Sequence, residues 1–297
     1  MTIIGVRKIT YTVSGALVAA SVLAIAIWGL RLGIDFTGGS LMEIEFSASR
    51  PESGKISERL GVLNLDNAVI QPTGERGVII RLPDLDEVRH EQVKRALLPL
   101  GEFQEKRFDS IGPTIGAELK RKSIWAIIVV MIMIIAYIAW AFRHVSHPMQ
   151  SWKYGIAAVI ALIHDVTIPT GVFAVLGRLY GVEVDTLFVT ALLTILGFSV
   201  HDTIVVFDRI RENLKKFLSK GNFEEVVEKS IKDTVSRSIN TSLTVMLVML
   251  ALYFFGGSST KFFSLAILIG VGFGTYSSIF IASALLVTWH KWSQRRA

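Results

Sequence analysis

Hydrophobic positions along this chain gather into long uninterrupted runs, unlike the short periodic stretches of a soluble protein. Six runs approach or exceed the roughly 20 residues that a helix needs to cross a bilayer; they cover residues 9–30, 124–142, 154–179, 186–207, 239–255 and 262–289. Because lipid offers the backbone no hydrogen-bond partner, each run is expected to be helical. The pattern therefore predicts a membrane all-α bundle of six transmembrane helices.

The first run follows Arg7 and Lys8, as the apolar part of a secretory signal peptide would. Its apolar stretch is longer than the roughly 7 to 15 residues of such a peptide. We therefore interpret residues 1–30 as a short cytoplasmic N-terminus and a retained first transmembrane helix.

Residues 31–122, between the first two runs, are polar and show the periods of a small folded domain. Alternating apolar positions predict strands at 41–46, 66–71, 77–82 and 102–108, with a turn at 72–75. Residues 57–63 and 85–98 have the spacing of helices. The order strand, helix, strand, strand, helix, strand predicts one small α+β ferredoxin-like domain, a fold that says little about function.

The positive charges indicate how the chain is oriented. The net charge of +6 is also found in nucleic-acid-binding proteins, but here the Lys and Arg residues lie mostly in segments that share one side of the membrane if both termini are cytoplasmic. The short loops on the other side contain only Arg178 and Lys261. We expect a multi-pass protein of the bacterial inner membrane, with the lipid bilayer and not nucleic acid as its partner and with residues 31–122 outside the cytoplasm.

The remaining part of the chain, 123–297, is expected to contain five transmembrane helices and one longer cytoplasmic loop at 208–238. Apolar residues in this loop recur at steps of three and four opposite charged residues, as in amphipathic helices. We expect these helices to lie along the membrane surface or against a partner.

Two carboxylates inside the predicted spans are the main candidates for function. Asp165 follows His164 in the third span, and Asp202 follows His201 and precedes Thr203 in the fourth. An acid within a span is unfavourable by several kcal/mol unless it is paired, hydrated or protonated, so it usually faces the bundle interior. Histidine titrates near neutral pH, so each His–Asp pair is a candidate proton relay.

The fifth span supplies a candidate partner for Asp202. Arg237 is expected to enter the membrane at a similar depth, and the helix wall after it is polar. Its lining residues are Asn240, Thr241, Ser242 and Thr244. We hypothesise a hydrated proton route in which protonation of Asp202 releases Arg237. The alternatives are a purely structural Asp202–Arg237 ion pair, His164 and Asp165 as polar contacts that hold helices together, and His201 as a packing residue.

Glycine spacing indicates how the helices pack, and missing motifs exclude several classes of function. Gly270 and Gly274 have the Gly-x-x-x-Gly spacing that lets helices approach closely. The chain has no Cys, no nucleotide-binding loop, no His-Glu-x-x-His and no Gly-x-Ser-x-Gly. We expect no enzymatic activity, no metal and no cofactor, with protons as the coupling ion.

Several motifs together resemble the SecF branch of the SecD/SecF family of protein-export membrane proteins, within the resistance-nodulation-division superfamily. They lie at 33–39, 110–116, 164–165, 197–213 and 237–244, in the order of that family. The motif residues outside the spans are Asp35, Phe36, Thr37, Gly38, Gly39, Gly112 and Pro113. His201 departs from the Asn of many relatives, and Val245 from an expected Thr.

The resemblance implies a subunit that works with SecD at the SecYEG channel, with YajC as a further candidate partner. Such a subunit would use the proton-motive force to promote late translocation and release of the translocating preprotein. Asp202 would then be the protonatable acid and Arg237 its basic partner. Half of a small-molecule or lipid exporter of the same superfamily, or a passive translocon assembly subunit, are the alternatives.

Overall fold

The computed structural model describes residues 2–143, 150–217 and 222–295. The chain forms two compact units. One, here called the helical domain, comprises Met1–Arg31 with Trp125–Ala297, and the other, the sheet domain, comprises Leu32–Ile124. The predicted limits of the polar region were 31–122, so the boundaries differ by one or two residues.

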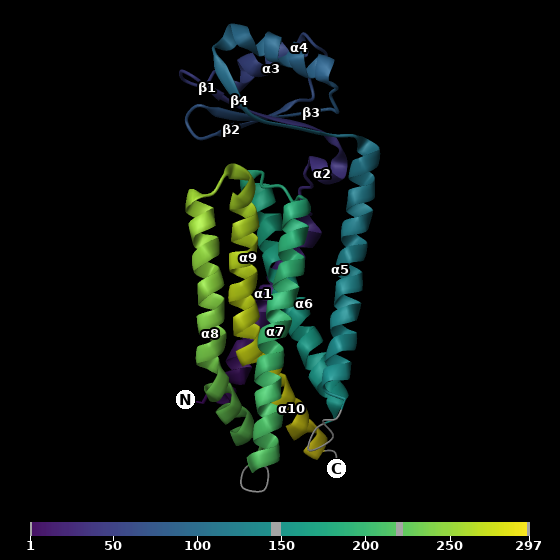
Figure 1. The fold of residues 1–297 in the computed structure, drawn as a ribbon, viewed down its shortest axis with the longest axis vertical. Helices are drawn as coiled ribbons and strands as arrows, with labels where there is room; N and C mark the ends of the chain where they lie inside the picture. The colour runs from purple at the N-terminus through teal and green to yellow at the C-terminus, as the bar shows by residue number, and fades with distance from the viewer. Residues whose placement is uncertain (1, 144–149, 218–221, 296–297) are drawn as a thin grey trace. The chain divides into compact units, whose positions relative to one another are not determined.

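The sheet domain has the predicted ferredoxin-like order of elements. These are β1 (Gly39–Phe46), α3 (Ser53–Gly61), β2 (Val69–Thr73), β3 (Gly77–Leu82), α4 (Glu87–Leu97) and β4 (Phe103–Ile111). The antiparallel sheet has the order β2-β3-β1-β4, and α3 and α4 cover one of its faces (Figure 1). Met42, Ile44 and Phe46 alternate along β1 and are buried in the core between sheet and helices, as the period of two predicts.

One turn of this domain lies later than predicted. Pro72 and Thr73 belong to β2, pairing with Val78 and Gly77 of β3. The turn follows them at 74–76, where Gly74 has a positive φ of 56°. A proline is tolerated here because β2 is an edge strand with no neighbour on its outer side.

In the described residues six helices are long and apolar enough to cross a membrane, which confirms the predicted bundle. They are formed by α1 (Arg7–Trp28), α5 (Pro113–Ala141), α6 (Ser151–Tyr180), α7 (Thr186–Phe217), α8 (Phe223–Phe255) and the continuous run of α9 (Ser258–Ser277), η3 (Ser278–Ala282) and α10 (Ser283–Gln294). About half of the apolar window of α6, α7 and the last helix is buried inside the chain, against 11% for α8 and 6% for α5. The latter two therefore present most of their surface to lipid or to a partner.

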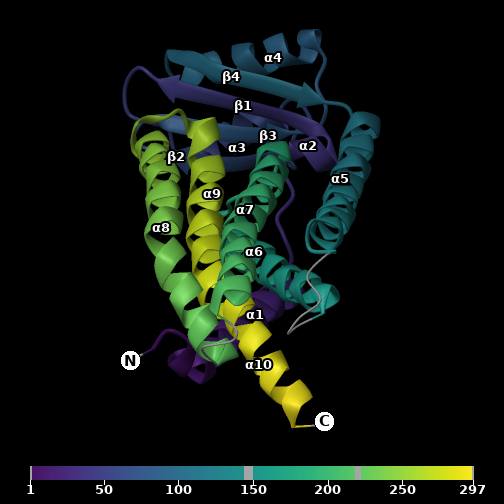
Figure 2. The same cartoon turned by 60° about the horizontal axis from the view of Figure 1, so that its bottom comes forward.

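The two views of the helical domain show α8 beside α9, with α5 on the other side of the bundle (Figures 1 and 2). Within the last helix, η3 is a π-helical segment that begins directly after Ser277. The hydroxyl of Ser283 donates to the Ser278 carbonyl at 2.8 Å, across this segment. Such π segments often accompany functional sites.

The segment 208–238 differs from the expected surface helices. Its first part continues α7 to Phe217 and its last part is the beginning of α8, while 218–221 lie outside the described residues. The apolar face predicted for it packs inside the chain, where Ile210, Val227 and Ile231 join one buried cluster with Ile4 and Leu286. Burial against the chain's own helices removes this apolar face from the membrane surface.

Two glutamates at the start of α8 hold the N-terminal segment. Glu228 accepts hydrogen bonds from the backbone amides of Ile3 at 3.0 Å and Ile4 at 2.9 Å. Glu224 pairs with Arg7 at 2.5 Å and also with Lys291 of α10. Because free amides at a helix start need acceptors, Glu228 acts as a cap supplied by a distant helix.

Candidate functional site

Asp165 is the most buried acid of the helical domain, with an exposed fraction of 0%. Its Oδ1 lies 2.8 Å from Nδ1 of His164. Its Oδ2 accepts hydrogen bonds from Ser199 of α7 at 2.5 Å and from Ser277 of α9 at 2.7 Å. Three helices therefore meet at this carboxyl group, and none of the described Lys or Arg residues pairs with it.

Asp202 is the second buried acid, with 7% of its surface exposed. Its Oδ2 accepts from Thr275 of α9 at 3.1 Å and from Ser242 of α8 at 3.4 Å. The Ser242 and Thr275 hydroxyls are also hydrogen-bonded to each other. Asp202 therefore joins α7, α8 and α9 through hydroxyl groups.

The two acid clusters share two helices. Ser199 and Asp202 lie three residues apart on α7, and Thr275 and Ser277 lie two apart on α9. At 3.6 residues per turn, three residues cover about 0.8 of a turn and two residues about half a turn. Each of these two helices therefore supplies a polar group to both clusters.

The Gly-x-x-x-Gly pair brings α9 against α7 at this level. A Cβ at Gly274 would meet Cβ of Ser199 at 3.3 Å and Oδ2 of Asp165 at 3.7 Å. A Cβ at Gly270 would overlap the side chain of Ile195, one turn before Ser199. The predicted role of these glycines in close helix approach is confirmed, and it places the α9 hydroxyls within reach of both acids.

The chemistry of this arrangement follows from two buried carboxyl groups that pair with no described Lys or Arg, although Asp165 also contacts His164. An ionised carboxylate away from water is costly unless it is compensated, whereas hydroxyl groups can donate to the ionised form and accept from the protonated form. The two sites are therefore suited to holding a proton and releasing it when water gains access.

The predicted ion pair between Asp202 and Arg237 is absent from the described structure. Arg237 is exposed and Asp202 contacts only hydroxyl groups. The reason is the rotation of α8. Ser238 and Ser242 face the bundle at 1% and 6% exposure, and Arg237 is turned about 100° from Ser238, given 3.6 residues per turn.

Of the other residues predicted to form the proton relay or its polar lining, some are buried and others are exposed. His201 is exposed, and Thr203 is buried but makes no described hydrogen bond to either acid. Of the predicted polar lining, Ser242 alone contacts an acid in the described structure. The other three predicted lining residues are exposed on α8; they are Asn240, Thr241 and Thr244.

Apart from Ser242, sequence reasoning missed the hydroxyl groups that donate hydrogen bonds to the acids. Ser199, Thr275 and Ser277 lie in otherwise apolar spans, and a single hydroxyl residue there carries little signal because its side chain can also bond to its own helix backbone. The available signal was Ser277, which follows the Gly-x-x-x-Gly pair on a helix already expected to pack closely.

The glycine motif of the sheet domain has a packing role. Gly38 has a φ of +74°, and a Cβ there would lie 2.7 Å from Cα of Pro113. A Cβ at Gly116 would lie 2.8 Å from the Gly38 amide nitrogen. The two motifs, distant in sequence, are thus in backbone contact next to α2 (Ile34–Thr37), where Phe36 is buried. Gly39, with a φ of +121°, lies equally close to the Leu82 carbonyl.

Other motif residues surround this contact. The Thr37 hydroxyl donates to the Gly33 carbonyl at 3.1 Å, and Asp35 lies in α2. A Cβ at Gly112 would meet only Oδ2 of Asp84, at 3.6 Å.

Comparison with known proteins identifies the family. Residues 92–292 match the family described as protein export membrane protein SecD/SecF, C-terminal, and residues 24–49 match the SecD/SecF GG motif. The chain belongs to the SecD/SecF family. The GG match includes Gly38 and Gly39, and the longer match includes Asp165, Asp202 and the hydroxyl groups that contact them.

Similar proteins are named as translocase subunits. The protein translocase subunit SecF of Thermobaculum terrenum is 46% identical over 95% of this chain and 92% of its own length. That of Haemophilus influenzae is 37% identical over 94% of this chain and 83% of its own. The names describe a transport role and not catalysis.

The fold is also that of a solved member of the family. The crystal structure of SecDF from Thermus thermophilus, described as a translocon-associated membrane protein, superposes with a TM-score of 0.85 at 34% identity over 97% of this chain. The chain spans 38% of the length of that SecDF chain. A SecDF structure in a super-membrane-facing form gives a TM-score of 0.71 at 33% identity, over 100% of this chain and 39% of that one. The SecF-like chain is therefore a multi-pass membrane protein with a SecDF-like fold.

Proposed function

We propose that this chain is the SecF subunit of a proton-driven export complex in the bacterial inner membrane. With SecD it acts at the SecYEG channel, where it uses the proton-motive force to promote late translocation and release of preproteins outside the cytoplasm. Both termini are cytoplasmic in this proposal. The observation that carries it is the burial of Asp202 among hydroxyl groups without a cation.

Proton binding at Asp202 has a direct mechanical consequence in this arrangement. The ionised carboxylate accepts hydrogen bonds from α8 and α9, whereas the protonated group donates one bond and accepts fewer. Loading and unloading the proton therefore changes how α7, α8 and α9 are held together. Asp165 joins α6 to the same two helices α7 and α9, so it provides a second coupled position.

The outer face of α8 supports the assignment of SecD as partner. Arg237, Asn240, Thr241 and Thr244 are exposed at the spacing i, i+3, i+4, i+7, which is a single helix face. The Thr241 and Thr244 hydroxyls donate to carbonyls of their own helix, at 3.0 and 2.8 Å. A polar stripe with an Arg on a lipid-facing helix is costly, and helices of a partner subunit would cover it.

The proton role is tested with Asp202→Asn, which keeps the shape of the side chain and removes the titratable group. Export of a preprotein is measured in inner-membrane vesicles with a proton gradient and after its collapse. We expect the variant to lose the gradient-dependent part of export and to keep the remainder. Asp208→Asn is the matched control, because Asp208 lies on the same helix, is exposed and pairs with Arg211 at 2.6 Å. Full gradient stimulation in Asp202→Asn would reject the proposal.

The partner face is tested separately by co-purification with a SecD chain. Arg237→Leu is expected to reduce recovery of SecD, whereas Arg178→Leu, at an exposed position near the end of α6, leaves recovery unchanged. Equal recovery with both variants would show that the α8 face is not the contact.

A further inference from the structure

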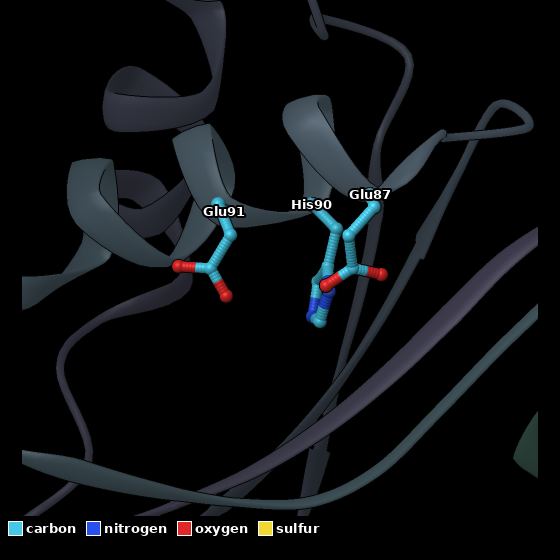
Figure 3. A group of neighbouring side chains, drawn as sticks. All are labelled: Glu87, His90 and Glu91. Carbon is cyan, nitrogen blue, oxygen red and sulfur yellow. The ribbon is translucent and has the colours of Figure 1, made fainter.

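One face of α4 carries three groups of the kind that hold metal ions. Glu87, His90 and Glu91 are spaced i, i+3 and i+4, so their side chains project from the same side of the helix (Figure 3). One ligand atom from each lies within 4.8 Å of the other two. Acidic groups on a helix are common, so the argument depends on the histidine.

The His90 ring is fixed by its surroundings. It is 5% exposed and stacks on Phe108 of β4 with ring centroids 3.7 Å apart and an angle of 7° between the planes. Its Nε2 lies 2.8 Å from Oε2 of Glu105, also on β4. Because an ionised carboxylate only accepts, Nε2 carries the proton.

The other nitrogen of this ring has no partner. His90 Nδ1 is buried and makes no hydrogen bond. The nearest acid is Glu87, whose Oε1 is 3.6 Å away, outside the range of a hydrogen bond. Buried polar atoms rarely stay unpaired, and a ring nitrogen of this histidine lies within 4.8 Å of a carboxylate oxygen of both Glu87 and Glu91.

A carboxylate that fixes one nitrogen of a histidine while the other is free is the arrangement found around protein-bound zinc. Zinc ligands lie about 2.0 to 2.2 Å from the ion, which separates them by about 3.4 Å in a tetrahedron. The present separation closes by side-chain rotation of Glu87 and Glu91, which are 81% and 43% exposed.

We propose that Glu87, Nδ1 of His90 and Glu91 form a binding site for a divalent transition-metal ion of the zinc class, with water or a group from another chain as the fourth ligand. Glu105 is the positioning residue, since it acts through the ring. This proposal departs from the expectation of no metal, which depended on the absence of known motifs.

Lys94 competes with the ion in this site. Its ammonium group hydrogen-bonds to Oε1 of Glu91 at 2.5 Å. The second oxygen of Glu91 takes no part in this bond. Removing the ammonium group should free both oxygens for the metal ion.

The test is calorimetric titration of the chelator-treated full chain in detergent with ZnCl₂. We expect Glu87→Ala to lose one equivalent of bound Zn²⁺, since this exposed residue can be changed without disturbing the fold. Glu58→Ala, an exposed glutamate on α3, should bind as the unmodified chain does. Lys94→Gln should bind Zn²⁺ more tightly, and a Glu87→Ala/Lys94→Gln double variant should lose that gain.

Two outcomes would overturn the site. If Glu87→Ala and Glu58→Ala bind the same number of equivalents with the same affinity, the ion binds elsewhere on the chain. If Lys94→Gln tightens Zn²⁺ binding equally in the presence and absence of Glu87, the gain in affinity comes from removing a positive charge and not from coordination by the proposed ligands.

Discussion

Gly270→Ala tests whether close contact between α7 and α9 is what positions the hydroxyl groups around both acids. The added methyl group would lie 2.8 Å from Cγ2 of Ile195 and still closer to Cγ1 and Cδ1. Carbon atoms in contact prefer about 3.5 to 4.0 Å, so the mildest of the three overlaps is about 0.7 Å. Ile195 is fully buried, and well-packed interiors accommodate an added methyl group poorly.

The matched control is Gly272→Ala, two residues along the same helix, where the new Cβ would meet only Cε of Met246 at 3.9 Å. Replacing Gly by Ala favours a helix by about 0.8 to 1 kcal/mol at either position. Because both variants have this gain in helix propensity, it cancels when their unfolding free energies are compared. The difference that is left is the cost of overpacking at Gly270, which we expect to be about 1 to 3 kcal/mol.

Unfolding of the purified chain in mixed micelles measures this difference, and gradient-dependent export in vesicles measures the consequence. We expect Gly270→Ala to be less stable than Gly272→Ala and to lose export, since displacing α9 moves Thr275 and Ser277 away from the acids. Ile195→Ala removes all three overlapping atoms, so in that background Gly270→Ala should cost nothing further. Equal stability of the two glycine variants, or no rescue by Ile195→Ala, would refute this account of the contact.

Three further changes follow from described contacts. Glu228→Gln should destabilise the chain by about 1 to 3 kcal/mol, because one of the two backbone amides that Glu228 binds loses its acceptor, and should speed hydrogen exchange at the N-terminal segment. Gly38→Ala should destabilise the sheet domain in thermal unfolding, because alanine is strained at its positive φ and would overlap the Pro113 backbone. Ser277→Ala should weaken gradient-dependent export with little loss of protein, because it removes one of two hydroxyl donors to Oδ2 of Asp165.

Each change has a control on the same element or domain. Glu225→Gln, exposed on α8, should leave N-terminal exchange unchanged, and a similar increase in both variants would contradict the capping role of Glu228. Gly54→Ala, with no atom within 4 Å of its new Cβ, should not destabilise the sheet domain; comparable melting of the two glycine variants would argue against the Gly38 contact. Ser278→Ala, next to Ser277 but bonded to its own helix at 2.9 Å, should export normally; equal loss in both serine variants would remove the case for Ser277.

The sequence determined the large divisions of this molecule. Long apolar runs are required for crossing lipid, so the six spans could be placed before the structure was known. Alternation along β1 and the helical spacing around α4 identified the ferredoxin-like domain, and the motifs indicated the SecD/SecF family. Asp165 and Asp202 were recognised as buried, because an acid in an apolar run has few other favourable positions.

Only the tertiary structure decided which side chains meet at these acids. Hydropathy describes a whole segment, whereas contacts depend on the rotation of each helix, and one residue changes the direction of a side chain by about 100°. This is why Arg237 lies on the exposed face of α8 while Ser242 reaches Asp202. Thr275 and Ser277 reach the acids because Gly270 and Gly274 let α9 approach α7. The Gly-x-x-x-Gly spacing predicted a close approach, but no local pattern encodes which distant helix is met.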